Sequence, residues 1–194
     1  MTILFFDTEI TGLPDKRSPV TAKHQPHVVQ LAAILTDDDG AERASINLIV
    51  NPGVPIPEGA SKVHGITDEV ARQFGVHPKL AAVTLRALAA KADLLVAHNI
   101  EFDLFLVRTL FERHDLEPAL HEKQFCTMQA ATPILNLPPT DRMLAAGFDK
   151  PKPPKLEEAY RHFFGRDLEG AHDALVDVRA CRDMFFALKS RKEA

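Results

Sequence analysis

Four carboxylate residues and one histidine occur in three short segments of this chain. Asp7 and Glu9 lie in FFDTEITGL, Asp103 lies in AHNIEFD, and His172 and Asp177 lie in HDALVDV. Two carboxylates about 4 Å apart repel each other by about 4 kcal/mol at an effective dielectric constant of about 20, so a cluster of four is unfavourable unless cations lie between them. If the segments converge, the set indicates a metal site.

The ligand atoms indicate the class of metal and the chemistry. Carboxylate oxygens suit hard cations such as Mg²⁺ or Mn²⁺, whereas zinc favours histidine and cysteine partners. Two such cations about 3.5 to 4 Å apart can hold a scissile phosphate, activate a water molecule and stabilise the leaving 3′ oxygen. The residue types therefore predict metal-dependent cleavage of a phosphodiester bond.

Regular elements are expected around each segment. The apolar run ILFF predicts a central strand that ends near Asp7, and LLVAHN predicts a buried strand followed by a helix, so that Asp103 lies at a strand-to-helix junction. The third segment opens a long helix. The expected apolar helix faces include Leu104, Val107 and Leu110 or Phe111 after the second segment, and Val178, Cys181, Phe185 and Leu188 after the third.

The rest of the pattern predicts an α/β fold. Residues 27–37 and 44–50 are β-rich runs joined by a hairpin connection, residues 51–75 are rich in Pro and Gly and predict a loop, and helices are expected over 78–91 and 155–165. This order predicts a mixed β-sheet with helices on its faces. In such sheets the carboxyl ends of central strands converge on one crevice.

Several features have structural interpretations. The hairpin acids Asp37, Asp38 and Asp39 are expected to be solvated turn residues rather than metal ligands. Cys126 and Cys181 have apolar neighbours and are expected to be buried thiols. The proline-rich stretch 136–154 is too long for a routine connection and predicts a flap.

Composition limits the class of protein. The 194 residues fit one globular domain, 1–194, and no apolar run is long enough for a membrane span, so a cytoplasmic location is expected. The net charge of −4 argues against a broad basic surface, although two divalent cations would bring it to about zero.

Together, the three segments resemble the DEDDh exonucleases, a family that includes the bacterial proofreading ε subunit, ribonuclease T and oligoribonuclease. The first family motif matches Asp7 and Glu9 with the Thr-Gly that follows, the second matches the NIEFD that contains Asp103, and the third matches His172 and Asp177. The likeness extends from residue 2 to about residue 188. It implies a ribonuclease H-like fold and 3′-to-5′ exonuclease activity.

The resemblance also implies residue roles. Asp7, Glu9, Asp103 and Asp177 would hold two Mg²⁺ or Mn²⁺ ions, and His172 would act as the general base. An imidazole titrates near pH ~6.5, so the neutral form is available at physiological pH. Asp173 is expected to be a helix N-cap rather than a ligand.

Residues that contact the terminal nucleotide are implied in the same way. Ile10 stands where the family usually has threonine, so a hydroxyl hydrogen bond to the substrate is absent and altered affinity or preference is expected. The other implied contacts are the backbone at Gly12, the apolar side chains Leu13, Val63 and Phe102, and His64 in the family-like ASKVHGIT loop.

Other basic residues are weaker candidates for a role in the site. Lys150, Lys152 and Lys155 either meet substrate phosphates or form a solvated basic loop. His98 is expected to orient the second motif. The remaining histidines are expected to be solvated or to cap helices; they are His24, His27, His77, His114, His121 and His162.

The preferred function is a stand-alone exonuclease on the 3′ end of single-stranded DNA or short oligonucleotides, since no tail that would tether it to a polymerase is evident. RNA trimming is the runner-up. A non-catalytic nucleic-acid-binding module and a ribonuclease H-type endonuclease are rivals from other classes. Several members of the family are dimers, so a homodimer is a further expectation.

Overall fold

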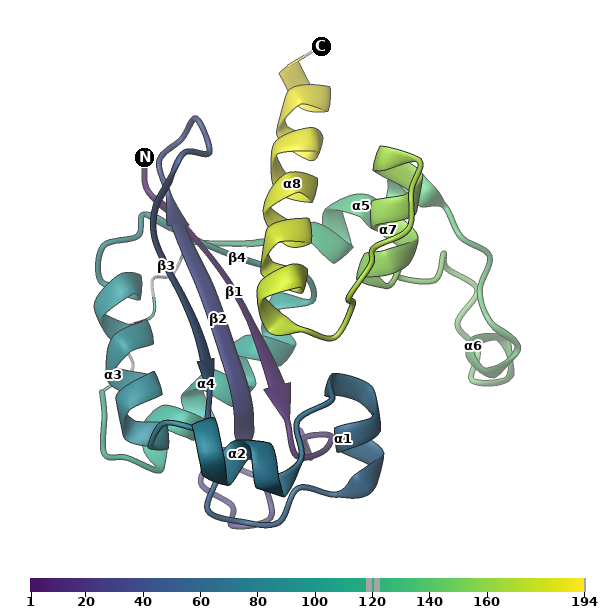
Figure 1. Ribbon diagram of the computed structural model, residues 1–194. Helices are drawn as coiled ribbons and strands as arrows, with labels where there is room; N and C mark the ends of the chain where they lie inside the picture. Colours follow the sequence, from purple (N-terminus) through teal and green to yellow (C-terminus); the bar gives the residue numbers. More distant parts are fainter. Residues whose placement is uncertain (118–119, 121–122, 194) are drawn as a thin grey trace.

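In a computed structural model, a mixed five-stranded sheet lies between two layers of helices (Figure 1). The structure describes residues 1–117, 120 and 123–193. The strands are β1 (Ile3–Ile10), β2 (Val28–Thr36), β3 (Glu42–Ile49), β4 (Leu94–Ala97) and β5 (Gln124–Cys126). The helices are α1 (Glu58–His64), α2 (Asp68–Phe74), α3 (Pro78–Ala89), α4 (Ile100–Glu112), α5 (Thr127–Leu135), α6 (Asp141–Ala145), α7 (Leu156–Phe164) and α8 (Ala174–Glu193).

The order of strands across the sheet is β3-β2-β1-β4-β5. β2 pairs antiparallel with both β1 and β3, whereas β4 pairs parallel with β1 and β5. The α/β fold with a mixed sheet is therefore confirmed, and β1 lies at its centre.

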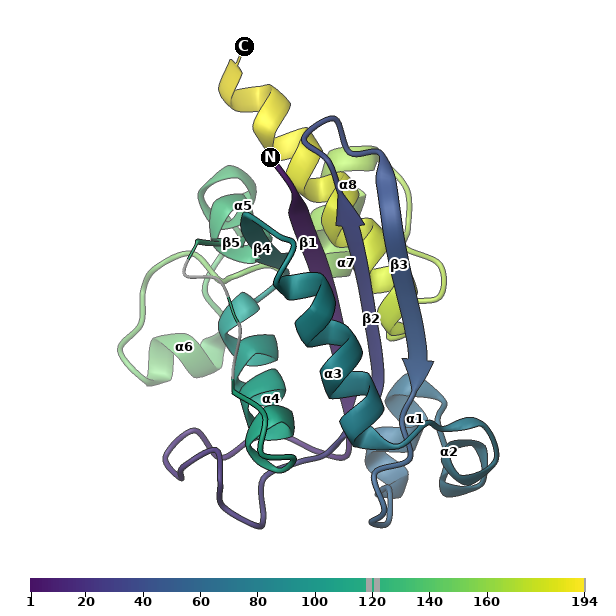
Figure 2. The same ribbon diagram turned by 90° about the vertical axis from the view of Figure 1, so that its left-hand side faces the viewer.

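Apolar side chains from both faces of the sheet hold the layers together. One core cluster packs α3 and α4 against β1, β2 and β4, on the face seen in front in Figure 2. On the opposite face, Val178, Cys181 and Phe185 of α8 pack against Ile3 and Phe5 of β1. Both expected apolar helix faces and both expected buried cysteines are confirmed.

Residues 51–75 were expected to be a loop, and there the prediction was wrong. They contain α1 and α2, each of seven residues. Gly65 ends α1 in a left-handed conformation with a φ of 75°, and the hydroxyl of Thr67 then caps α2 by accepting a hydrogen bond from the Val70 N–H. Pro and Gly here separate short helices rather than exclude them.

The connection between β2 and β3 is the expected hairpin. Gly40 has a φ of 86°, and the Asp37 carboxylate accepts from the N–H groups of Asp39 and Ala41 and pairs with the Arg43 guanidinium. These contacts support the interpretation of Asp37 as a turn residue.

Residues 136–154 form an excursion that contains α6 and projects from the body of the molecule (Figure 1). A backbone hydrogen bond from Lys152 to Leu137 closes its base. The Lys152 ammonium pairs with Glu158 at 2.6 Å, and the Lys155 N–H donates to the same carboxylate. The first contact favours a structural role for the Lys152 side chain, whereas the second is made by the Lys155 backbone and assigns no role to its ammonium.

Within the described residues, no helix is both long and apolar enough to span a bilayer.

Candidate active site

β1 carries the first two carboxylates on the face of the sheet that α8 covers. Side chains alternate along a strand, so Ile3, Phe5, Asp7 and Glu9 share one face. Ile3 and Phe5 pack there against α8. Asp7 and Glu9 follow at the carboxyl end of the strand, where the first turn of α8 begins.

The start of α4 supplies the third carboxylate. Asn99 precedes this helix in a left-handed conformation with a φ of 71°. Asp103 lies in the first turn, is only 2% exposed and accepts hydrogen bonds from the Thr8 N–H at 3.1 Å and the Thr8 hydroxyl at 2.9 Å. These two bonds hold the Asp103 carboxylate against β1 at Thr8, the residue between Asp7 and Glu9 in the sequence.

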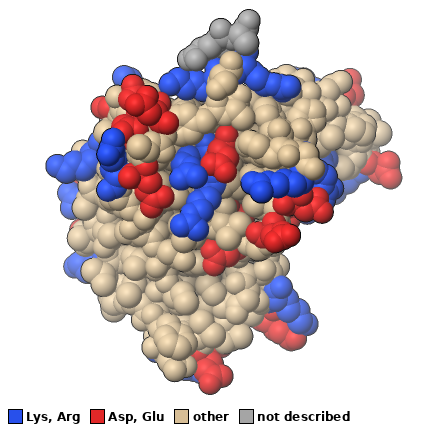
Figure 3. Space-filling view, turned by 45° about the horizontal axis from the view of Figure 1, so that its top comes forward, with Lys and Arg blue, Asp and Glu red and all other residues tan. Residues whose placement is uncertain are grey.

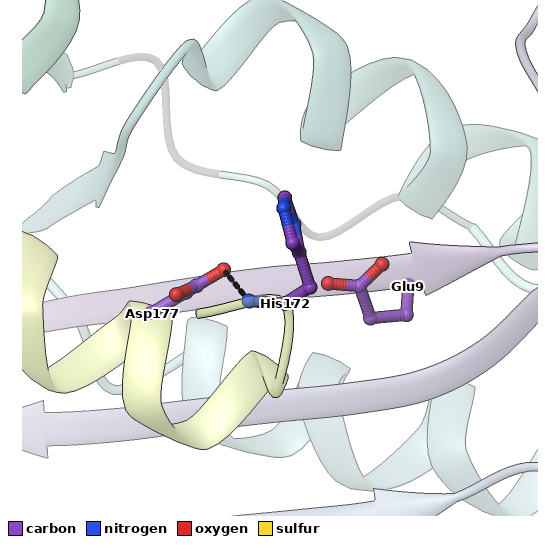
Figure 4. A group of neighbouring side chains, drawn as sticks. All are labelled: Glu9, His172 and Asp177. Carbon is purple, nitrogen blue, oxygen red and sulfur yellow. Dashed lines mark hydrogen bonds between the residues drawn. The ribbon is translucent and has the colours of Figure 1, made fainter. Parts of the chain in front are cut away.

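The entry to α8 brings the last two motif residues beside Glu9 (Figure 4). The backbone N–H of His172 donates to Asp177 Oδ2 at 3.2 Å. Asp173 Oδ1 accepts from the N–H groups of Leu175 and Val176 at the start of the helix, so the N-cap interpretation of Asp173 is confirmed.

The four carboxylates strongly perturb one another. Burial and the charges of its acidic neighbours raise the pKa of Asp7 well above its ordinary range. Burial, followed by the charges of Asp177 and Asp103, raises the pKa of Glu9 to about 8. Burial also raises the pKa of Asp103 to about 7, against the lowering effect of the Thr8 hydrogen bonds, and that of Asp177 to about 6. Buried carboxylates that repel in this way require positive charge between them to ionise together.

The same residues fit a divalent cation. Oδ1 of Asp177 is buried and has no hydrogen-bond partner among the described residues, so this oxygen has an unused lone pair within the site. Ligand atoms of Glu9, His172 and Asp177 lie within 4.8 Å of one another. Oxygen donors of this kind suit Mg²⁺ or Mn²⁺.

Glu157 of α7 was not singled out by the sequence, yet it contacts the site. Its Oε1 lies 3.6 Å from Nε2 of His172, and its charge contributes to the raised pKa of Asp177. Glu157 belongs to none of the three motifs, so the sequence did not indicate that it lies near the site. The packing of α7 beside α8 brings it there.

An apolar pocket of about 630 Å³ opens beside Glu9 and His172. It gathers all the residues expected to contact a nucleotide, namely Ile10, Gly12, Leu13, Val63, His64 and Phe102. Leu13 is 87% exposed at the pocket, whereas Ile10 is buried. α1 and the end of β1, far apart in sequence, thus build one cavity.

A buried glutamine organises the segment that carries Leu13. Gln25 is 1% exposed; its amide accepts from the Asp15 N–H and donates to the carbonyls of Asp15, Ser18 and Pro19. Nothing in the sequence pattern distinguished this glutamine from a surface residue.

The other histidines differ in their surroundings. His98 bridges the Thr127 hydroxyl and the Pro154 carbonyl, which joins the second motif to the base of the excursion. His77 caps α3, as expected, by accepting from the Lys79 N–H. His27 was expected to be solvated or to cap a helix, but it is partly buried, because the chain packs it against the end of α4. His121 lies outside the described residues.

Because the pKa of Glu9 is raised, we predict that the metal-free protein becomes less stable as the pH rises. The unfolded chain loses the Glu9 proton near the ordinary value of 4.5, whereas the folded chain holds it to about 8, so this contribution to stability is lost as the pH rises between the two. The full shift corresponds to about 4 kcal/mol at pH 8, and because Glu9 is only partly buried, so that solvent screens its charge, we expect metal-free Glu9→Gln to be about 2 kcal/mol more stable than wild type. Urea unfolding followed by circular dichroism measures this, since the chain has no tryptophan.

Asp39→Asn, in the exposed hairpin, is the matched control and is expected to leave the stability difference near zero. Equal stability of Glu9→Gln and wild type across this pH range would contradict the electrostatic interpretation of the site.

Comparisons with known proteins agree with this geometry. The RNase_T family model, described as "Exonuclease", matches residues 4–185. A DNA polymerase III subunit epsilon-like protein of Rhodobacter capsulatus is 36% identical over 110 residues, which make up 56% of this chain and 14% of that protein. An uncharacterized exonuclease, CP81, of Escherichia phage 186 is 29% identical over 195 residues, with 95% of this chain and 87% of the phage protein covered.

Solved structures share the fold. E. coli exonuclease I in complex with a dT13 oligonucleotide superposes with a TM-score of 0.78 and 23% identity, over 99% of this chain and 42% of that one. The chain therefore spans less than half the length of exonuclease I and a small part of the Rhodobacter protein. The family model matches nearly the whole chain, and the three DEDDh motifs of the sequence meet in one site. This chain therefore belongs to the RNase T family of exonucleases, within the DEDDh class.

Proposed function

We propose that residues 1–194 form one domain that hydrolyses phosphodiester bonds from the 3′ end of single-stranded DNA or short oligonucleotides and releases nucleoside 5′-monophosphates. The observation that carries this proposal is the meeting of four mutually repelling carboxylates and His172 beside an apolar pocket. Structures of E. coli exonuclease I, whose fold this chain shares, contain single-stranded DNA or a dT13 oligonucleotide, and they support the choice of substrate.

In this proposal, Asp7, Glu9, Asp103 and Asp177 hold two Mg²⁺ or Mn²⁺ ions. When bound, such ions supply charge stabilisation at the scissile phosphate and at the leaving oxygen, and they lower the pKa of the attacking water. The hydrogen bonds from Thr8 to Asp103 and from His172 to Asp177 keep these two carboxylates oriented before any ligand arrives.

His172 accepts the proton of the attacking water. Its imidazole is exposed to the site, while its backbone is tied to Asp177. The carboxylate of Glu157, near Nε2, favours the positive charge that the ring acquires on accepting the proton.

The apolar pocket holds the terminal nucleotide. Ile10, Leu13, Val63 and Phe102 provide surfaces for a base and a sugar, and Gly12 lets the backbone approach the nucleotide without a side chain in between. On the face seen in Figure 3, acidic and basic side chains alternate, and the described residues form no continuous basic surface there. That face therefore offers no continuous track for a long phosphate backbone.

A digestion assay tests the function. The chain is incubated with Mg²⁺ or Mn²⁺ and a 5′-labelled single strand whose 3′ end is free or blocked. Stepwise shortening from the free end alone is expected. A few internal cuts, in the blocked substrate as well as in the free one, would instead indicate an endonuclease. Binding without cleavage would indicate a non-catalytic module.

The preference between DNA and RNA is tested with oligomers of matched sequence and several lengths. Faster digestion of DNA is expected for the wild type. Ile10→Thr, which restores the hydroxyl usual in the family, is the informative comparison, because it changes one contact in the nucleotide pocket and no carboxylate.

A further inference from the structure

A second cavity, of about 520 Å³, lies on the face of the sheet that α3 and α4 cover. Its walls include His27, His77, Arg113 and His114, from the entry to β2, the start of α3 and the segment after α4. In Figure 2 the lower ends of α3 and α4 lie side by side there. Among the described residues, this cavity shares no lining residue with the pocket beside Glu9.

Arg113 is the one permanently charged side chain among the described residues that line this cavity. None of the described residues that line it is acidic. The Arg113 guanidinium donates to the carbonyls of Gln25 and Pro26, and within the described residues it forms no ion pair. An anion would satisfy this uncompensated positive charge.

The positive charge of Arg113 also acts on His27. Burial, followed by the charges of Arg113 and His114, lowers the pKa of His27 to about 4. A neutral ring results, and the charge of Arg113 remains unopposed.

His77 offers a hydrogen-bond donor to the cavity. Nδ1 of His77 accepts from the Lys79 N–H, so the proton of its neutral ring is on Nε2. The ring of His114 lies 5.6 Å from that of His77, at 61° to it. Two neighbouring imidazoles that line one cavity can therefore contact the same ligand.

Part of the cavity wall is apolar. Pro52 and Pro78 line it beside the polar groups, and the narrow extension toward Val28, Leu106 and Leu110 has room for only about 10 Å³. A ligand that matches the main cavity has a phosphate beside Arg113 and a flat, largely apolar portion against the two prolines. The volume lies within the range of about 300 to 1,000 Å³ typical of small-molecule sites.

We propose that this cavity, defined by His27, His77, Arg113 and His114, is a second, non-catalytic binding site for a nucleotide phosphate. The nucleotide is either free or part of a longer strand that also reaches the first pocket. Binding here requires neither bound metal nor turnover, so the proposal stands independently of the exonuclease function.

The backbone links the two pockets. The Thr11 N–H donates to the His27 carbonyl, and the His27 N–H donates to the Thr11 hydroxyl, both at 2.9 Å. Thr11 lines the first pocket and His27 lines the second. A single-stranded nucleic acid that follows this part of the surface would contact both pockets.

Histidine-ring NMR signals of the full, metal-free chain test the proposal, with each of the nine rings assigned by single substitution. Thymidine 5′-monophosphate is expected to shift the His27 and His114 signals saturably at millimolar concentration, and thymidine without phosphate is expected to bind at least about tenfold more weakly. His114→Gln is expected to weaken binding about tenfold. His77→Asn, which preserves a capping side chain, is a second variant with the same expectation, and His162→Gln is the matched control.

An eight-residue oligothymidylate with a blocked 3′ end distinguishes the two sources. A nucleotide within a strand predicts tighter binding of the oligomer than of the monophosphate, with shifts at both His27 and His64. A free nucleotide predicts that the oligomer shifts only His64 and His172. Shifts of His64 and His172 alone with the monophosphate, equal binding of thymidine, or no saturation would each overturn the proposal.

Discussion

Asp7→Asn is expected to lower exonuclease turnover at least about 10³-fold at saturating Mg²⁺ or Mn²⁺, which corresponds to about 4 kcal/mol of lost transition-state stabilisation. Asp7 lies at the centre of the cluster: its pKa is raised by the charges of Asp103, Asp177 and Glu9 after burial itself. An amide in its place keeps the shape but removes the negative charge that cations require.

The loss should not come from unfolding. Because Asp7 is repelled by its neighbours, neutralising it is expected to leave metal-free protein at least as stable as the wild type. Single-turnover digestion of a 5′-labelled strand, beside urea unfolding of the same preparation, separates the two effects. Asp38→Asn, which removes the same charge from the exposed hairpin turn, is the control and should keep full activity. More than a tenth of wild-type turnover in Asp7→Asn would remove Asp7 from the ligand set.

The sequence allowed the central elements to be predicted where the pattern is local. The continuous apolar run of β1 is typical of a central strand buried on both faces, and the buried stripes of α4 and α8 follow a helical period, so a short window identifies each. The same local spacing put Asp7 beside Glu9 and His172 beside Asp177. The convergence of all three segments, by contrast, was expected only from the resemblance and from the general behaviour of such sheets.

Features that depend on tertiary contacts were not predictable in this way. Strand β5 has three residues, too few for a periodic signal, and forms because β4 offers a parallel partner. The position of Glu157 beside His172 depends on how α7 packs on α8. Gln25 owes its role to the carbonyl groups that a folded loop presents to it.

Backbone conformation at the site is also invisible to a residue pattern. His172 has a φ of 69° and Asn99 a φ of 71°, both in the left-handed region. Asparagine adopts this region readily, but histidine does so at some cost. At His172 the hydrogen bond from its N–H to Asp177 holds the conformation, so the backbone that aims the ring also fixes a proposed metal ligand.

This coupling decides which substitution tests the base. His172→Asn removes the imidazole while keeping a residue that tolerates the left-handed conformation, so the bond to Asp177 should persist. Turnover is expected to fall about 10² to 10³-fold, the usual contribution of a positioned general base, with little change in the KM for the oligonucleotide. Rapid-quench digestion under saturating metal measures both quantities.

Added imidazole tests whether the missing ring acts as a base or only as a spacer. His172 is exposed, so a free imidazole can reach the place of the lost side chain. Partial recovery of turnover in His172→Asn, with no effect of imidazole on the wild type or on Asp7→Asn, is the expected result. His162→Asn, at an exposed position on α7, should behave as wild type. Undiminished turnover in His172→Asn would mean that another group accepts the proton, and Glu157, whose carboxylate lies 3.6 Å from the ring, would be the first residue to replace.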